Sequence, residues 1–481
     1  MKPRHLVWFR SDLRTADNTA LYEACRNSSV HAVGVFIVCG KQWQRHDWGP
    51  AKVDFVLRSV EALGDALADR GIPLRVLQVP TFKQVPQALG ELARQEKCES
   101  LYFNREYEVN ERARDERTTN VFQSDGLAVH TFDDQTILPP DEIRTQAGAF
   151  YTVFSPFKKS WLKRAKSEAD DLSPRQRPRR RSGSTPRPDK VPDRVEGFDP
   201  SPMDPDLWPA GEKEAKRRLD RFIDRHAGDY HKDRDLPAVD GTSTLSPYLA
   251  CGSISARQCL HAAMEANRGR LDGGRKGLDT WISELIWREF YRHVLVGFPR
   301  VSKHLPFKRD TDRLPWSEDR DLFQAWCDGQ TGYPIVDAAM RQLNATGWMH
   351  NRLRMVSAMF LTKDLLIDWR WGERYFMQHL VDGDLASNNG GWQWSASTGT
   401  DAVPYFRIFN PTSQSERFDK DGSFIRQWCP ELAELDHKAV HDPSRLPPLV
   451  CSSLDYPEPI VDHAKARQRT LAAFKKLSAR H

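Results

Sequence analysis

Short apolar runs alternate with helix-period stretches over the first 134 residues of the chain. Such runs are typical of strands buried in a parallel sheet, and apolar positions that recur every three to four residues are typical of amphipathic helices. The predicted strands are His5–Phe9, Val30–Val38, Pro73–Val79, Ser100–Phe103 and Val129–Phe132, and the clearest helices are Ala51–Arg70 and Gln84–Lys97. This alternation predicts an α/β domain with a doubly wound parallel sheet over residues 1–134.

The pattern changes after about residue 204, where the strand-like runs stop and helical periodicity continues. The predicted helices are Glu212–Arg225, Ala256–Ala266, Thr280–Val296, Ile335–Asn344, His350–Asp368 and Gly372–Leu380. Several successive helices with few strands predict a helical bundle, so we expect an all-α domain over residues 205–481.

Residues 135–204 are expected to connect the two domains. Within them, Ser173–Arg194 is rich in proline, arginine and serine and poor in apolar residues. Such a segment cannot bury enough surface to fold alone, so we expect an exposed linker. Its arginines could contact DNA phosphates, but a solvated run of charge is the simpler interpretation.

Composition narrows the class of protein. The 481 residues carry a net charge of +5, which is compatible with a polyanionic partner. The eight cysteines form no C-x-x-C pair or metal-type cluster, so we expect no metal site, reduced thiols and a cytoplasmic protein. No secretory signal is present, and no apolar stretch approaches the roughly 20 residues that span a bilayer.

A nucleotide-binding fingerprint is also missing, because the chain contains neither G-x-G nor the P-loop pattern. Any ligand of the α/β domain must therefore be held without a glycine-rich phosphate cradle.

The segment DGDLASNNGGWQW, residues 382–394, has almost no aliphatic residue with which to build a core. Its Asn, Asp and Gly residues favour a polar turn that lies close to a bulky partner. If WMHNRLRM, residues 348–355, is helical, Arg354 could form a charge-assisted pair with Asp382 or Asp384. A surface turn beside an ordinary amphipathic helix explains the same residues, and residue types alone leave both open.

Two further segments suggest a ligand. GTSTLSPYLACG, residues 241–252, is a hydroxyl-rich turn before a helix, an arrangement that offers donors to an anion. The helix at 279–294 separates an aliphatic face from a face with Trp281, Glu284, Trp287, Arg288 and Tyr291. That second face suits a cleft that stacks planar rings, although core packing of both tryptophans is the alternative.

The stretch DGDLASNNGGWQWSASTGTDAVPYFRIFNP, residues 382–411, resembles the flavin-binding core of the photolyase/cryptochrome family. It is most similar to the bacterial cyclobutane pyrimidine dimer photolyases that use a folate antenna. The resemblance implies FAD as cofactor, 5,10-methenyltetrahydrofolate as antenna, damaged DNA as partner and a monomeric enzyme. The implied activity is light-driven splitting of the dimer by an electron from excited, reduced FAD.

The resemblance also implies roles for particular residues. The implied FAD contacts are Tyr230, Thr242, Ser243, Thr244, Leu245, Ser246, Trp281, Arg354, Asp382, Gly383, Asp384 and Asn388. The implied catalytic residues are Glu284, Asn351, Met355 and Asn388, and the implied electron-transfer chain is Trp392, Trp369 and Trp316. The implied antenna contacts are Asn110, Glu111 and Lys303. The implied DNA contacts are Arg234, Glu284, Trp287, Arg288, Tyr291, Asn351, Arg352, Trp394, Arg407 and Gln414.

Four of these positions refine the expectation. Asn388 is assigned to the flavin N5 edge, where an amide can accept an N5 proton, unlike a carboxylate, whose charge would oppose the anionic reduced ring. Asn351 and Met355 stand where relatives that repair the (6-4) photoproduct carry histidines, so we expect the cyclobutane dimer as the lesion. Thr244 stands where relatives often carry a larger or basic residue, so one phosphate contact differs from the family pattern.

Three other functions are compatible with parts of the sequence. A cryptochrome-like photoreceptor would share the fold, but we expect repair because Asn388 is an amide and no long tail follows the last predicted helix. A dark redox flavoenzyme would need a dinucleotide site, which the sequence lacks. A DNA-binding module without catalysis would leave the flavin motifs without a purpose.

Overall fold

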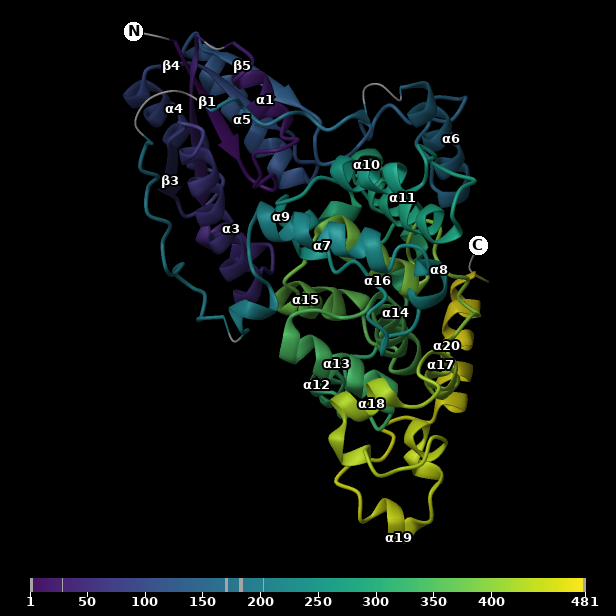
Figure 1. Ribbon diagram of the computed structural model, residues 1–481. Coiled ribbons are helices and arrows are strands. Elements are labelled where there is room, and N and C mark those ends of the chain that lie inside the picture. Colours follow the sequence, from purple (N-terminus) through teal and green to yellow (C-terminus); the bar gives the residue numbers. More distant parts are fainter. Residues whose placement is uncertain (1–2, 28, 169–171, 181–184, 202, 479–481) are drawn as a thin grey trace. The chain divides into compact units, whose positions relative to one another are not determined.

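The structure is a computed structural model (Figure 1) that describes residues 3–27, 29–168, 172–180, 185–201 and 203–478. By internal packing, the chain divides into two compact units that interleave along the sequence. Unit 1 comprises Met1–Gly228, Ser243–Pro299 and Val381–Asp384, and unit 2 comprises Asp229–Thr242, Arg300–Leu380 and Leu385–His481. The domain limits predicted at residues 134 and 204 follow the change from strand-like to helical pattern along the sequence. The two units are instead groups of residues that pack together.

A five-stranded parallel sheet forms the centre of the N-terminal part, in the order β3-β2-β1-β4-β5. The strands are β1 Arg4–Phe9, β2 His31–Val38, β3 Leu74–Gln78, β4 Cys98–Asn104 and β5 Ala128–Phe132. Because the strand order reverses at β1, right-handed crossovers place helices on both faces of the sheet. The predicted doubly wound α/β fold is therefore confirmed.

The helices of unit 1 lie between and after these strands. They are α1 Thr19–Ala24, α2 Gly40–Arg45, α3 Pro50–Ala68, α4 Val85–Glu96, α5 Val109–Ser124, α6 Phe154–Ser167, η2 Pro205–Leu207, α7 Glu212–Arg225, α9 Ser246–Cys251, α10 Ala256–Ala266 and α11 Lys276–Gly297. Packing in this layer is tight at Gly34 of β2, where an added Cβ would lie 3.1 Å from Phe9 and 3.2 Å from Leu67. A larger residue here would require the side chains of Phe9 and Leu67 to shift by a few tenths of an ångström.

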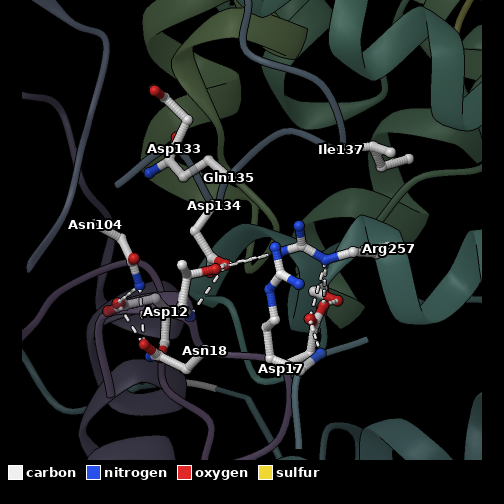
Figure 2. Close-up of polar contacts among 12 residues, drawn as sticks. Asp12, Asp17, Asn18, Asn104, Asp133, Asp134, Gln135, Ile137 and Arg257 are labelled. Atoms are coloured by element: carbon white, nitrogen blue, oxygen red, sulfur yellow. Dashed lines mark hydrogen bonds and ion pairs between the residues drawn. The ribbon is translucent and has the colours of Figure 1, made fainter. Parts of the chain in front are cut away.

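Buried ion pairs join loops of the sheet to α10 within unit 1 (Figure 2). Arg257 Nε lies 2.9 Å from Asp17 Oδ1, and its Nη2 lies 2.9 Å from Asp134 Oδ1. Arg14 pairs with Asp134 from the other side, and each of these four residues is at most 6% exposed. Since an unpaired charge at this depth is costly, the pairs fix α10 against the sheet.

The predicted linker forms hydrogen bonds with the α/β part in some of its described residues. Its residues 181–184 lie outside the described residues, and its flanking stretches contain many exposed side chains. However, the backbone of Arg175 exchanges hydrogen bonds with Asp17, and Asp189 donates its N–H to Leu74 O at the edge of the sheet. The described parts of the linker are therefore attached to the α/β part at Arg175 and Asp189.

Unit 2 is helical in its described residues. Its elements are α8 Tyr230–Asp233, η3 Val301–Lys303, η4 Arg309–Arg313, α12 Arg320–Asp328, α13 Pro334–Thr346, α14 Asn351–Met359, η5 Phe360–Asp364, α15 Trp369–His379, α16 Leu385–Ala396, α17 Pro411–Phe418, α18 Ser423–Trp428, η6 Pro430–Leu432, η7 Ala439–His441, η8 Pro443–Arg445, α19 Pro448–Cys451 and α20 His463–Ser478. Its core gathers around α13, with fully buried Val336, Met340 and Leu343 packed among Trp326 and Trp392. The predicted helical domain is confirmed in its fold class.

Two local predictions are wrong. The segment expected as a polar turn forms α16, because Ala386, Asn389, Trp392 and Ala396 recur at helical spacing and are all buried. Packing of this face outweighs the low helix propensity of the Asn and Gly residues. The helix expected to end at residue 368 stops at Met359 and continues as a π-helical turn to Asp364, a feature common near functional sites.

Candidate functional site

The hydroxyl-rich turn contains one residue with a strained backbone, and an arginine side chain contacts it. Thr244 adopts a left-handed backbone with φ of 48°, which is unusual for a β-branched residue. Arg218 on α7 donates from Nη1 to Thr244 Oγ1 over 3.0 Å, and it pairs with Glu214 at 2.8 Å. The Arg218 guanidinium, already paired with Glu214, thus also contacts a hydroxyl of this turn. No sequence pattern pointed to Arg218, because α7 has the residue pattern of an ordinary charged helix.

Of the flavin contacts implied around this turn, Ser243, Thr244, Leu245 and Ser246 belong to unit 1. Tyr230 on α8 and Thr242 belong to unit 2.

Helix α11 has the predicted aliphatic face, with Ile282, Ile286 and Phe290 fully buried. The opposite face is less open than the pattern indicates. Trp281 is only 4% exposed and packs on Phe222, with ring centroids 4.8 Å apart. Glu284, Trp287, Arg288 and Tyr291 are half-buried.

Trp287 stacks on Phe154, with ring centroids 3.6 Å apart and an interplanar angle of 9°. One face of its indole is therefore covered, and only the other face can stack on a ligand.

Arg288 has internal partners. Its guanidinium donates to the backbone carbonyls of Gln135 and Leu249, and burial lowers its pKa to about 10. Nearby Arg292 adds to that shift, while Asp384 opposes it. A phosphate contact by Arg288 remains a prediction, and this side chain is already held by carbonyl oxygens.

The segment Val381–Asp384, which carries two predicted flavin carboxylates, is held by cations of unit 1. Asp384 Oδ2 accepts from Arg292 Nη2 over 2.7 Å, and the Gly383 carbonyl accepts from Lys52 Nζ over 2.7 Å. Sequence reasoning assigned neither cation. Arg354, the partner expected from the sequence, donates from Nε to Met349 O within unit 2. Its pairing with Asp382 or Asp384 remains a prediction.

The predicted antenna residues Asn110 and Glu111 lie in the first turn of α5. His46, which follows α2, contacts both: its Nδ1 lies 3.3 Å from Glu111 Oε1 and its Nε2 lies 3.1 Å from Asn110 Nδ2. Burial raises the pKa of the Glu111 carboxyl well above its ordinary value, and the neighbouring Glu108 and Glu106 add to this. Such a carboxyl gains from a ligand that presents N–H donors.

The sequence did not reveal these contacts of His46, because it lies far from α5 along the chain. Lys303, the third predicted antenna contact, is an exposed residue of η3 in unit 2.

Helix α14 presents Asn351 and Met355 one turn apart, with Asn351 Nδ2 4.0 Å from Met355 Sδ. His350 caps the helix by accepting the backbone N–H of Arg352 at Nδ1. The Arg352 side chain pairs with Asp235 at 2.8 Å and lies over the Phe418 ring. The cap and the pair together fix the start of the helix.

Helix α16 is oriented by a chain of amide hydrogen bonds. Asn388 Nδ2 donates to the Glu373 carbonyl over 2.9 Å, and Asn389 Nδ2 donates to the Glu373 carboxylate over 2.8 Å. Gln393 in turn donates to Asn389. Because the amide of Asn388 is planar, fixing its nitrogen directs Oδ1 the other way, where it can accept a proton.

The three tryptophans of the predicted relay all belong to unit 2. Trp392 and Trp369 are buried, at 2% and 1% exposure, and Trp316 is half-buried. The ring neighbours of Trp392 are Phe376, with centroids 4.9 Å apart, and Trp326, with centroids 6.0 Å apart. The order of electron transfer remains a prediction.

The remaining predicted DNA contacts in unit 2 lie on or near its surface. Arg407 is exposed beside Phe406, which is 60% exposed. Arg234, Trp394 and Gln414 are half-buried.

Among the described residues, no group of His, Cys, Asp and Glu could hold a metal ion. Within the same residues, no helix has the length and apolar character needed to cross a bilayer.

Family models match both parts of the chain, as DNA photolyase over residues 5–178 and as the FAD-binding domain of DNA photolyase over residues 281–476. The chain belongs to the DNA photolyase family. As a photolyase it carries FAD, and six of the twelve predicted FAD contacts fall within the second match. The hydroxyl turn lies outside that match, but its hydroxyls and the Arg218 guanidinium fit the phosphates of this cofactor.

Individual photolyases are similar to this chain over its whole length. The deoxyribodipyrimidine photo-lyases of Salmonella typhimurium and Escherichia coli are 50% and 48% identical, each with 98% of both chains covered. Among solved structures, the class III photolyase of Agrobacterium tumefaciens has a TM-score of 0.88 and 35% identity, with 100% of this chain and 98% of that chain covered. A Synechocystis cryptochrome has a TM-score of 0.86 and 29% identity, with 98% and 99% covered.

The buried cap of α14 makes the photolyase sensitive to acid. Burial lowers the pKa of His350 to about 4, Arg352, Arg354 and Arg234 lower it further, and Asp235 opposes them. Because the folded pKa lies below the unfolded value of about 6.5, this histidine stabilises the fold above pH 6.5 and loses that contribution as pH falls towards 4.

We expect the free energy of unfolding to drop by about 2 kcal/mol more between pH 8 and pH 5 in the natural protein than in His350→Asn. Asparagine keeps an acceptor at the helix start but does not titrate. Urea unfolding at the two pH values measures the difference, and equal drops in both proteins would contradict the assignment.

Proposed function

We propose that the protein splits cyclobutane pyrimidine dimers in DNA with an electron from photoexcited, reduced FAD. The observation that carries this proposal is the 48–50% identity, over 98% of the chain, to enzymes named deoxyribodipyrimidine photo-lyase. The similar cryptochrome is only 29% identical and does not favour a photoreceptor instead. When bound, reduced FAD supplies the electron that opens the cyclobutane ring and receives it back afterwards.

In this proposal the residues of the chain orient the cofactor and the lesion. Asn388 holds its Oδ1 toward the N5 edge of the flavin, and Asp382, Asp384 and Arg354 position the ring. Tyr230, Thr242 and the turn Ser243–Ser246 bind the remainder of the cofactor. The hydrogen bond from Asn388 to the Glu373 carbonyl supports this role, because it leaves the amide oxygen as the acceptor.

The lesion is bound outside the duplex. Photolyases are themselves a standard example of enzymes that extrude their target nucleotide. Trp287 and Trp394 form the aromatic walls of the lesion pocket, and Glu284, Asn351 and Met355 contact the dimer. Tyr291, Gln414 and the arginines 234, 288, 352 and 407 contact the DNA, with Arg407 supported by its exposure. Salt weakens binding because these cations displace counterions from phosphates.

The proposal includes a monomeric enzyme in the cytoplasm. Its eight cysteines are free in the structure, which suits a reducing compartment.

Purified, reduced protein should repair the cyclobutane dimer in an irradiated oligothymidine under blue light and leave the (6-4) photoproduct untouched. Asn351 and Met355 cannot shuttle a proton as a histidine pair can, and splitting a cyclobutane ring needs no such shuttle. Recovery of thymine absorbance measures dimer repair, with a dark sample as control. Efficient repair of (6-4) DNA would contradict the proposed lesion.

Trp316→Phe should abolish most photoreduction of oxidised flavin and leave repair by chemically reduced enzyme unchanged. Phenylalanine keeps the packing of a half-buried ring but is much harder to oxidise. Trp371→Phe, a half-buried tryptophan of α15 outside the proposed relay, is the matched control. Flavin absorbance under illumination with an external donor measures the effect, and normal photoreduction in Trp316→Phe would refute the relay.

We propose that Asn110, Glu111 and Lys303 bind the folate antenna. The Glu111 carboxyl accepts N–H donors of the pterin edge, and Lys303 meets the anionic glutamate tail. The internal contacts of Glu111 and Asn110 with His46 support a preformed site.

Glu111→Ala should bind folate roughly tenfold to a hundredfold more weakly, since a hydrogen bond to a charged group contributes about 1.5–3 kcal/mol. Repair under light absorbed directly by the flavin should persist. Glu116→Ala, an exposed change on the same helix, is the control. Full retention of the near-ultraviolet folate band by the Glu111 variant would show that the site is assigned wrongly.

A further inference from the structure

Four consecutive residues pack in a different unit from the residues that precede and follow them in the chain. Val381–Asp384 follows α15 and precedes α16, which both belong to unit 2, yet these residues pack with unit 1. They include Asp382, Gly383 and Asp384, the proposed flavin contacts. Whatever fixes this segment in unit 1 therefore also sets the direction of two carboxylates in the cofactor site.

Lys52 on α3 contacts the middle of this segment. Its Nζ donates to the Gly383 carbonyl over 2.7 Å and lies 3.6 Å from the centroid of the Trp48 ring. Trp48 in turn stacks on Trp43, with centroids 4.8 Å apart and an interplanar angle of 13°. Lys52 is 8% exposed, and its ammonium contacts both the Trp48 ring and the Gly383 carbonyl.

Arg292 on α11 contacts the end of the same segment. Its Nη2 lies 2.7 Å from Asp384 Oδ2, and the arginine is 4% exposed. One cation thus holds the backbone at Gly383 and a second holds the next side chain. Two anchors on adjacent residues restrict both the position and the rotation of the segment.

The charges around Lys52 favour its cationic form near neutral pH. Burial lowers the pKa of Lys52 to about 8, and the groups that oppose this shift are Asp384, Glu108, Cys251 and Glu106. A methionine of similar length would fill the same space without charge, so apolar packing alone does not require a lysine here.

We propose that Lys52 is a positioning residue of the flavin site, which acts through the Gly383 carbonyl to orient Asp382 and Asp384 toward the cofactor. The α/β part of the chain thereby sets flavin affinity as well as holding the antenna. This inference rests on the proposed function, because it takes Asp382 and Asp384 as flavin contacts. It adds a residue that touches neither cofactor nor lesion.

The test compares Lys52→Met, Lys52→Arg and the exposed control Lys41→Met in full-length protein. We expect Lys52→Met to weaken FAD binding to the apoprotein roughly tenfold, since one hydrogen bond from a charged donor is lost. It should also alter the fine structure of the flavin absorption band. Lys52→Arg should recover part of the affinity, because a guanidinium can still donate to the carbonyl. Lys41→Met should match the natural protein.

A double-mutant cycle with Asp384→Asn separates positioning from general stability. If Lys52 acts through the segment, the loss of FAD affinity in the double variant is smaller than the sum of the two single losses. Additive losses, or an unchanged affinity and spectrum in Lys52→Met, overturn the inference. A lower Tm with no rescue by Lys52→Arg also overturns it, since that result indicates a structural lysine. A natural protein that takes up FAD but repairs no dimer would instead contradict the proposed function.

Discussion

Burial of charge is the constraint on which unit 1 depends. Arg257 and Arg14 share Asp134 and Asp17 at a depth where an ion without a partner is strongly unfavourable. Each ion is satisfied only when α10 lies against the loops that follow β1 and β5. Apolar packing would tolerate small shifts of the helix, but paired charges accept only one arrangement. Within unit 1, α10 is thus fixed against the sheet.

The sheet and most helices were predictable because their signals are local. A run such as residues 33–38 of β2 is apolar at successive positions, and such a run is stable only when both faces are covered. Helix α16 was not predictable in this way. Its Asn and Gly residues favour turns locally, and the helix forms because Asn389 and Gln393 find partners and Trp392 finds a core. Sequence patterns carry no information about partners that are distant along the chain.

The residues of the candidate site show the same difference between local signals and partners that are distant along the chain. Asn388, Asp382 and the hydroxyl turn were found from resemblance and composition, because their residue types are unusual for a folded core. Arg218, His46, Arg292 and Lys52 were missed, since each is an ordinary charged residue until the fold brings it to a particular carbonyl, carboxylate or hydroxyl. A residue that acts by positioning another residue produces little recognisable pattern in a single sequence.

The interleaving of the two units has a consequence for how the protein is made. Chains are synthesised from the N-terminus at about 5–20 residues per second, and domains usually fold as they emerge. Unit 1 cannot complete its packing until Val381–Asp384 has left the ribosome, by which time much of unit 2 has also emerged. Gly383 must reach Lys52, 331 residues earlier in the chain. A chain that ended at residue 299 would therefore contain Lys52 and Arg292 before Gly383 and Asp384, their partners, had been synthesised.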